Sequence, residues 1–264
     1  MTLRASIETT AVALALTLSD GSGICLAQPA DTASTAAVPP VEPEAMASLD
    51  RMGAYLRALR TFTVRSETTT DEVTVDDEKL QFTGTVSMQV RRPDRLRMEV
   101  SSDRKDRQFF YDGRTLTIFG QRVGYYATVP APGTIRELIA LAEDKYGVVL
   151  PLSDLFRWGA EASPSAAVKE AAVIGLSRVG GVWCDHVAVR QDDVDWQVWI
   201  ERGKTPLPRK VVITSKTVPT HPQFVAVMNW NVAPTFDEAT FRFSPPKGSH
   251  PIALVAGDAE ARPK

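Results

Sequence analysis

Apolar and polar residues alternate along most of this chain, with the period of two that predicts half-buried β-strands. In residues 95–100, for example, the leucine, methionine and valine share one face and charged residues occupy the other. The pattern predicts eleven strands, at residues 61–75, 80–92, 96–102, 107–111, 114–119, 123–129, 171–179, 182–191, 195–201, 210–217 and 223–232. Short turns separate most of them, among them Asp112-Gly113, where we expect a two-residue hairpin turn. Strands joined in this way predict an antiparallel sheet.

Three stretches follow a helical period instead. Residues 44–60 carry apolar side chains at steps of three and four, which predicts a helix with one apolar face. A second helix is expected at residues 134–145, where Thr134 and Glu137 have the spacing of a capping box. Residues 151–158 predict a third, short helix whose apolar residues share one face.

Large apolar side chains occupy both faces of several strands, which is unlike a sheet with one face in water. Phe109 stands beside Phe110, and Trp196 lies close to Trp199. Three helices are too few to cover eleven strands laid flat. We therefore predict an α+β fold that is mainly antiparallel β: a strongly curved, unclosed β-barrel of about eleven strands, with three helical segments packed in or over its concave face.

The composition is that of an ordinary globular protein. The chain has 264 residues, of which 44% are hydrophobic, so a sizeable core is possible. Its formal net charge of −2 makes nucleic acid an improbable partner. No apolar run reaches the roughly 18 residues of a membrane-spanning helix.

The N-terminus has features of a secretory signal. Arg4 precedes an apolar run at residues 11–18, and Ala27 offers a small residue for cleavage, although Glu8 interrupts the pattern. We predict a signal peptide at residues 1–27, a flexible linker at 28–43, one domain at 44–246 and a C-terminal tail at 247–264. A disordered extension at the N-terminus is the alternative.

The two cysteines are placed differently with respect to this predicted cleavage. Cys25 could be lipidated, but the residue before it is Ile24, where that processing requires a small side chain. Cleavage after Ala27 would leave Cys184, which cannot form an internal disulfide and which we expect to be a small buried hydrophobe.

Motifs for catalysis or metal binding are missing from the sequence. We find no Gly-x-Ser-x-Gly, no P-loop and no His-Glu-x-x-His. His186, His221 and His250 are scattered rather than set at metal-ligand spacing. We predict a protein that is not an enzyme, with no catalytic residue, no metal site and no cofactor; an enzyme acting on envelope lipids or glycans is a remote alternative.

Several motifs resemble a known family. Arg92-Pro93-Asp94-Arg95-Leu96-Arg97, then Tyr111-Asp112-Gly113-Arg114-Thr115-Leu116 and a helical insert, resemble the lipoprotein carrier family LolA. Gly181-Val182-Trp183-Cys184-Asp185-His186, Trp196-Gln197-Val198-Trp199-Ile200-Glu201 and Leu207-Pro208-Arg209-Lys210 resemble the second half of an uncharacterised family of predicted periplasmic proteins with this fold. The match covers about residues 44–246.

This resemblance implies a periplasmic half-barrel closed by helices over an apolar cavity that takes acyl chains. In the carrier family, the arginine before the proline holds a helical lid shut, and here that position is Arg92. The helix at residues 134–145 would be the part that moves. The longer, more aromatic second half of this chain departs from the carrier, so its cargo of triacylated lipoproteins does not follow.

The candidate ligand-binding residues are Arg92, Leu96, Met98, Phe110, Leu116, Ile118, Leu138, Trp196 and Met228. Each apolar member could equally be plain core, and Arg92 belongs to a basic run, residues 91–107, that could be a solvated strand face. We predict a monomer that binds a lipid, an acyl chain or a lipidated protein. The alternative is an envelope sensor or assembly partner that binds another protein through its sheet surface or by strand addition at an edge.

Overall fold

The computed structural model describes residues 40–158 and 167–256, which lie within one compact unit. Its helices are α1 (Pro43–Ala58), α2 (Ile135–Tyr146), α3 (Asp154–Arg157) and the 3-10 helix η2 (Glu238–Phe241). Its strands are β1 (Thr61–Val73), β2 (Lys79–Arg91), β3 (Arg95–Ser102), β4 (Asp106–Tyr111), β5 (Thr115–Gly120), β6 (Tyr125–Pro130), β7 (Glu170–Val179), β8 (Val182–Arg190), β9 (Val194–Glu201), β10 (Pro208–Ser215), β11 (Gln223–Asn231) and β12 (His250–Pro251).

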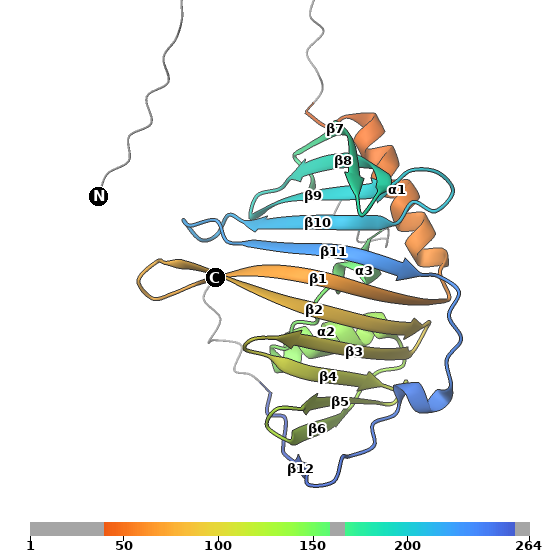
Figure 1. The fold of residues 1–264 in the computed structure, drawn as a ribbon, viewed down its shortest axis with the longest axis vertical. Coiled ribbons are helices and arrows are strands. Elements are labelled where there is room, and N and C mark those ends of the chain that lie inside the picture. Colours follow the sequence, from red (N-terminus) through yellow and green to blue (C-terminus); the bar gives the residue numbers. More distant parts are fainter. Residues whose placement is uncertain (1–39, 159–166, 257–264) are drawn as a thin grey trace, which may run out of the picture. The chain divides into compact units, whose positions relative to one another are not determined.

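All twelve strands of the described residues form one sheet, in the order β12-β6-β5-β4-β3-β2-β1-β11-β10-β9-β8-β7 (Figure 1). Neighbours are antiparallel, except that β12 runs parallel to β6. The eleven strands expected from the sequence are all present, and β12 is an addition. The sheet is curved and unclosed, with β7 and β12 at its edges, which confirms the predicted half-barrel.

The pairing of β1 with β11 joins the two halves of the sheet. It runs from Thr63 opposite Asn231 to Thr70 opposite Phe224, residues more than 150 positions apart in the chain. Every other antiparallel pair joins strands that follow one another in the chain. This single long-range pairing therefore makes one continuous sheet out of two meanders.

One core lies between the concave face of the sheet and the helices, as predicted. Alternate residues of the eleven longer strands enter it, including Phe62 and Val64 of β1 and Met98 of β3, none more than 1% exposed. Helices α1 and α2 contribute Leu56 and Leu138 to the same core. In Figure 1, α2 and α3 lie behind the sheet, on the face turned away from the viewer.

The C-terminal segment covers part of the opposite, convex face. Phe243 packs against Phe110, Phe119 and Tyr126, with ring centroids 5.0 to 5.4 Å apart. Glu238 of η2 forms ion pairs with two arginines at the start and end of the β2–β3 turn. This segment explains why β4 carries apolar side chains on both faces.

Two local predictions were wrong. The expected two-residue hairpin turn is a longer connection, residues 112–114, in which only Gly113 has positive φ (86°). The Asp112 carboxylate accepts hydrogen bonds from the backbone N–H groups of Arg114 and Thr115. The helix expected at 151–158 is limited to the four residues of α3, because Leu152 has a φ of 62° and so interrupts a right-handed helix.

Other predictions are confirmed or lie outside the described residues. Helix α2 has the capping box expected between Thr134 and Glu137. The predicted signal peptide at 1–27, Cys25, the linker up to residue 39 and the tail from residue 257 lie outside the described residues. Within the described part, no helix has the length and apolar character needed to cross a membrane.

Candidate functional site

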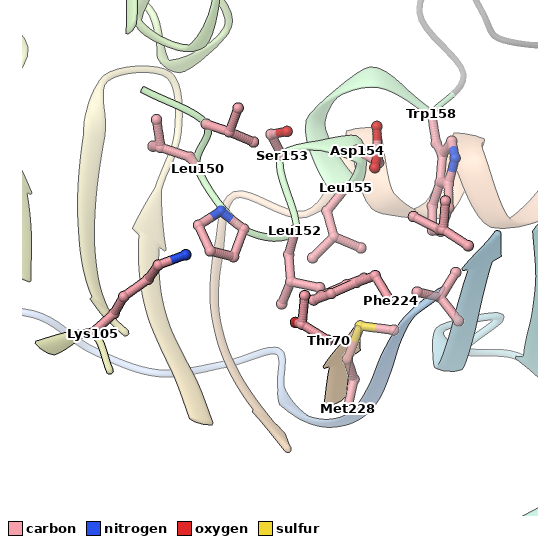
Figure 2. Close-up of a pocket in the computed structure, with 14 residues that line it drawn as sticks. Thr70, Lys105, Leu150, Leu152, Ser153, Asp154, Leu155, Trp158, Phe224 and Met228 are labelled. Carbon is pink, nitrogen blue, oxygen red and sulfur yellow. The ribbon is translucent and has the colours of Figure 1, made fainter. Parts of the chain in front are cut away.

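A hollow of about 380 Å³ lies on the concave side of the sheet (Figure 2). On one side it is bounded by residues 149–155 and by Trp158. We call residues 149–158, which include α3, the cover segment. On the other side it is bounded by side chains of three neighbouring strands and one turn: Thr70, Lys105, Val211, Ile213, Phe224 and Met228. Most of these side chains are apolar. We call this space the main hollow.

The main hollow exists because the cover segment is short and irregular. Helix α2 ends at Gly147, whose left-handed conformation caps it. The chain then forms no regular structure until α3, and the left-handed Leu152 turns its side chain toward Phe224 and Met228 (Figure 2). The cover segment therefore has no continuous apolar helix face to pack against the sheet, and space remains between the segment and the strands.

Two further hollows adjoin the main hollow. The tryptophan hollow, of about 260 Å³, is lined by Trp158, Trp196, Gln191 and Val194, and shares Asp154, Trp158, Val211 and Ile213 with the main hollow. Its two indole rings are stacked with centroids 6.1 Å apart. The hydroxyl hollow, of about 120 Å³, shares Thr70, Lys105, Pro151 and Phe224 with the main hollow. A ligand in the main hollow could therefore extend in either direction.

Arg92 lies where α1, α3 and β1 meet. Its guanidinium stands over the ring of Phe156 in α3, 5.1 Å from the centroid, and over Phe62 at 6.0 Å. One nitrogen, Nη2, lies 3.5 Å from the carbonyl oxygen of Leu56 in α1. The buried Nε has no hydrogen-bond partner among the described residues. Burial, and then the charge of Arg136, lower the pKa of Arg92. Arg92 thus contacts the cover segment through the ring of Phe156.

The eight apolar candidate residues proposed from the sequence fall into three groups. Met228 lines the main hollow and Trp196 the tryptophan hollow. Leu96, Met98, Leu116 and Leu138 are 0% exposed in the core beneath α2, and Ile118 packs against that core. Phe110 faces the other way, against Phe243.

Sequence reasoning missed the residues that bring the hollows together. Val211, Ile213 and Phe224 were recognised as strand residues, and Leu152 and Leu155 as one face of a helix, but none as ligand-binding. The alternation of apolar and polar residues along β10 and β11 indicates that the three strand residues lie on a buried face. No pattern in the sequence distinguishes a buried face that is filled from one that is hollow.

Burial raises the pKa of Asp154, which lines both larger hollows; the charge of Arg157 acts against this shift and that of Glu143 adds to it. Burial also raises the pKa of the Cys184 thiol to about 11, so it is not a thiolate at neutral pH. His186 stacks on Trp199, 4.0 Å between centroids. The described residues contain no cluster of three or more potential metal ligands.

The model of a family described as "Predicted periplasmic protein (DUF2092)" matches residues 45–255. The chain belongs to this family. The membership confirms the resemblance that the sequence motifs suggested, and it agrees with the expected compartment. No curated protein sequence matches the chain.

Several solved structures resemble the fold at low sequence identity. Lipoprotein LppX of Mycobacterium tuberculosis is 12% identical, with a TM-score of 0.45 over 74% of this chain and 99% of its own. LprF of Mycobacterium bovis is 14% identical, with a TM-score of 0.45 over 80% and 99%. A LolA superfamily protein of Nitrosomonas europaea is 10% identical, with a TM-score of 0.32 over 75% and 97%. None of these likenesses identifies a ligand for this chain.

Proposed function

We propose that this protein binds the acyl chain of a lipid or of a lipidated protein in the main hollow, as a carrier does. The observation that carries the proposal is the apolar space of about 380 Å³ between the cover segment and the concave face of the sheet. Each methylene group that leaves water for such a site contributes about 0.8 kcal/mol. Met228 adds an adaptable side chain to the wall.

The cover segment, rather than α2, is the part that moves in this proposal. Helix α2 is anchored by its capping box and by Leu138 and Ile139, which are at most 2% exposed. The cover segment instead borders the space that a ligand would enter. Arg92 stabilises its closed position through the ring of Phe156. Export through residues 1–27 would deliver the protein to the periplasm.

Native mass spectrometry of protein from an export-competent host tests the proposal. We expect a copurifying lipid, or uptake of palmitate after delipidation. Ile213→Trp, which places a large ring between the main and tryptophan hollows, should abolish uptake with little loss of stability. The matched control is Ile118→Trp on the packed part of the same face, where overfilling should cost about 1–3 kcal/mol of stability. An empty protein that takes up no palmitate contradicts acyl-chain binding.

The second candidate function is binding to another envelope protein. In its favour, β7 is an edge strand of the described sheet. Its outer side is bonded to residues 40–42 at Ala171 and, through the Glu42 carboxylate, at the Val173 N–H. Ile174, Leu176 and Trp183 at the β7–β8 end of the sheet are 51–59% exposed. A stoichiometric protein that copurifies and survives delipidation would support this function over lipid binding.

A further inference from the structure

On the concave face, the side chains of β1, β2 and β3 change from apolar to partly polar next to the main hollow. Val86 and Val100 lie opposite each other in one cross-strand row. The next row toward the strand ends contains Thr68, Gly84 and Ser102, which are paired across the three strands. This row is the floor of the hydroxyl hollow. The apolar surface thus continues into a hollow where Thr68, Thr70 and Ser102 lie among apolar side chains, Phe82 and Phe224 included.

Gly84 keeps the floor of the hydroxyl hollow open. A Cβ atom at this position would lie 2.8 Å from the Ser101 carbonyl oxygen, 3.1 Å from the Ser102 Cβ and 3.3 Å from the Thr68 hydroxyl oxygen. A side chain would therefore clash with the neighbouring backbone. Glycine inside a strand often marks a place where a ligand approaches closely.

Two cations border the hydroxyl hollow, at the β3–β4 turn. Arg104 contacts one oxygen of Glu72 at 2.6 Å, and Lys105 lies 3.6 Å from the other. The charged side chains that line the hydroxyl hollow are these two cations and the Glu72 carboxylate that they share, which leaves a net positive charge on its lining. Ser102 fixes the turn, because its hydroxyl oxygen accepts hydrogen bonds from both backbone N–H groups at 3.3 and 3.0 Å.

Lys105 also connects the two hollows, since it lines both. Figure 2 shows its ammonium group at the opposite side of the main hollow from Asp154 and Trp158. The hydroxyl hollow has a volume of about 120 Å³. A single bound water needs only about 10–15 Å³, so the hollow can hold a larger group. A small polar group fits there while an attached chain occupies the main hollow.

We propose that the hydroxyl hollow binds the anionic head group, a phosphate or carboxylate, of the same ligand whose acyl chain occupies the main hollow. The inference rests on the proposed acyl-chain binding and adds the ligand class, an anionic amphiphile. Arg104 and Lys105 supply charge-assisted hydrogen bonds, and the hydroxyls of Thr68 and Thr70 supply neutral ones. The asymmetry of the site sets the direction of the ligand, with its head at the β3–β4 turn.

Two probes that differ only in the phosphate test this proposal. Palmitoyl lysophosphatidic acid and monopalmitoylglycerol share chain and glycerol, and calorimetry below their micelle concentrations gives both affinities for the delipidated full chain. We expect the phosphate to increase affinity about tenfold or more, because hydrogen bonds to charged groups are the stronger kind. The double variant Arg104→Gln/Lys105→Gln should lose this preference and bind the two probes with equal affinity.

The controls separate the head-group site from general electrostatics and from the acyl site. Arg114→Gln/Lys204→Gln removes the same charge from exposed positions that line none of the three hollows, and should keep the preference. Equal affinity of the wild type for the two probes overturns the head-group site alone and leaves acyl binding standing. Failure of both probes to bind overturns the proposed function as well. Displacement of the phosphate probe by inorganic phosphate at similar concentration would show a free-anion site and overturn the link to the chain.

Discussion

Two regions of the concave face are covered in different ways. Beneath α2, the strands β3 to β5 and the helix form a packed core, in which Leu96, Leu116 and Leu138 have no exposed surface. Beneath the cover segment, strands β1, β10 and β11 face a hollow of about 380 Å³. Both regions use the same kinds of apolar side chain. The difference lies in the cover.

Cover geometry therefore decides where this fold has space. Helix α2 has twelve residues, a capping box at its start and a left-handed glycine at its end, so it presents a complete apolar face. Helix α3 has four residues and no side-chain cap at its described N-terminus. A short helix with irregular flanks packs fewer side chains against the area of sheet that it covers. We expect its displacement to require less free energy, because it breaks fewer contacts.

Deleting the same atoms in the two regions should have the largest contrasting effect. Leu138→Ala, beneath α2, should lower the free energy of unfolding by about 2–5 kcal/mol, because a fully packed site cannot collapse around the cavity. Leu155→Ala, at the wall of the main hollow, should cost clearly less because this side chain already borders empty space. Urea unfolding measures the loss of free energy of unfolding in both variants, provided that their m-values equal that of the wild type. Equal losses would mean that the hollow is closed in solution.

Removing the support of the cover segment should affect ligand release more than stability. Arg92→Leu loses the cation over Phe156, a contact of about 0.5–2 kcal/mol, so a bound acyl probe should leave roughly two- to thirtyfold faster in stopped-flow measurements. The control is Arg91→Leu, whose partner Glu238 lies on η2. An unchanged release rate in Arg92→Leu would show that this arginine specifies shape and nothing more.

The smallest expected effect is a pH dependence from Asp154. Burial raises its folded-state pKa above 3.8, so the charged carboxylate destabilises the folded protein near neutral pH. As the pH falls through the raised pKa, the folded state binds the proton first and the penalty disappears. Asp154→Asn should therefore raise the free energy of unfolding at neutral pH, and the gain should vanish below about pH 4.

Unfolding at a series of pH values, with Asp144→Asn on the exposed side of α2 as the control, measures this difference. A gain at neutral pH that persists at low pH would contradict the assignment to the Asp154 charge.

The sequence by itself determined most of the local structure. Alternation located the eleven long strands, because a half-buried strand repeats every two residues, and Thr134 with Glu137 located the start of α2, because a capping box needs that spacing. The same local rules failed at Leu152, where a residue without a special preference adopts a left-handed conformation. Nothing in the residue types marks such a site.

Only the tertiary structure decided the rest. The pairing of β1 with β11 and the packing of Phe243 over Phe110 join residues more than 100 positions apart, and no short-range pattern encodes them. The candidate site depends on the same kind of information. Leu138 and Leu155 are both buried leucines on helices, yet one fills the core and the other borders a hollow, because a void is a property of the whole cover and not of any residue that lines it.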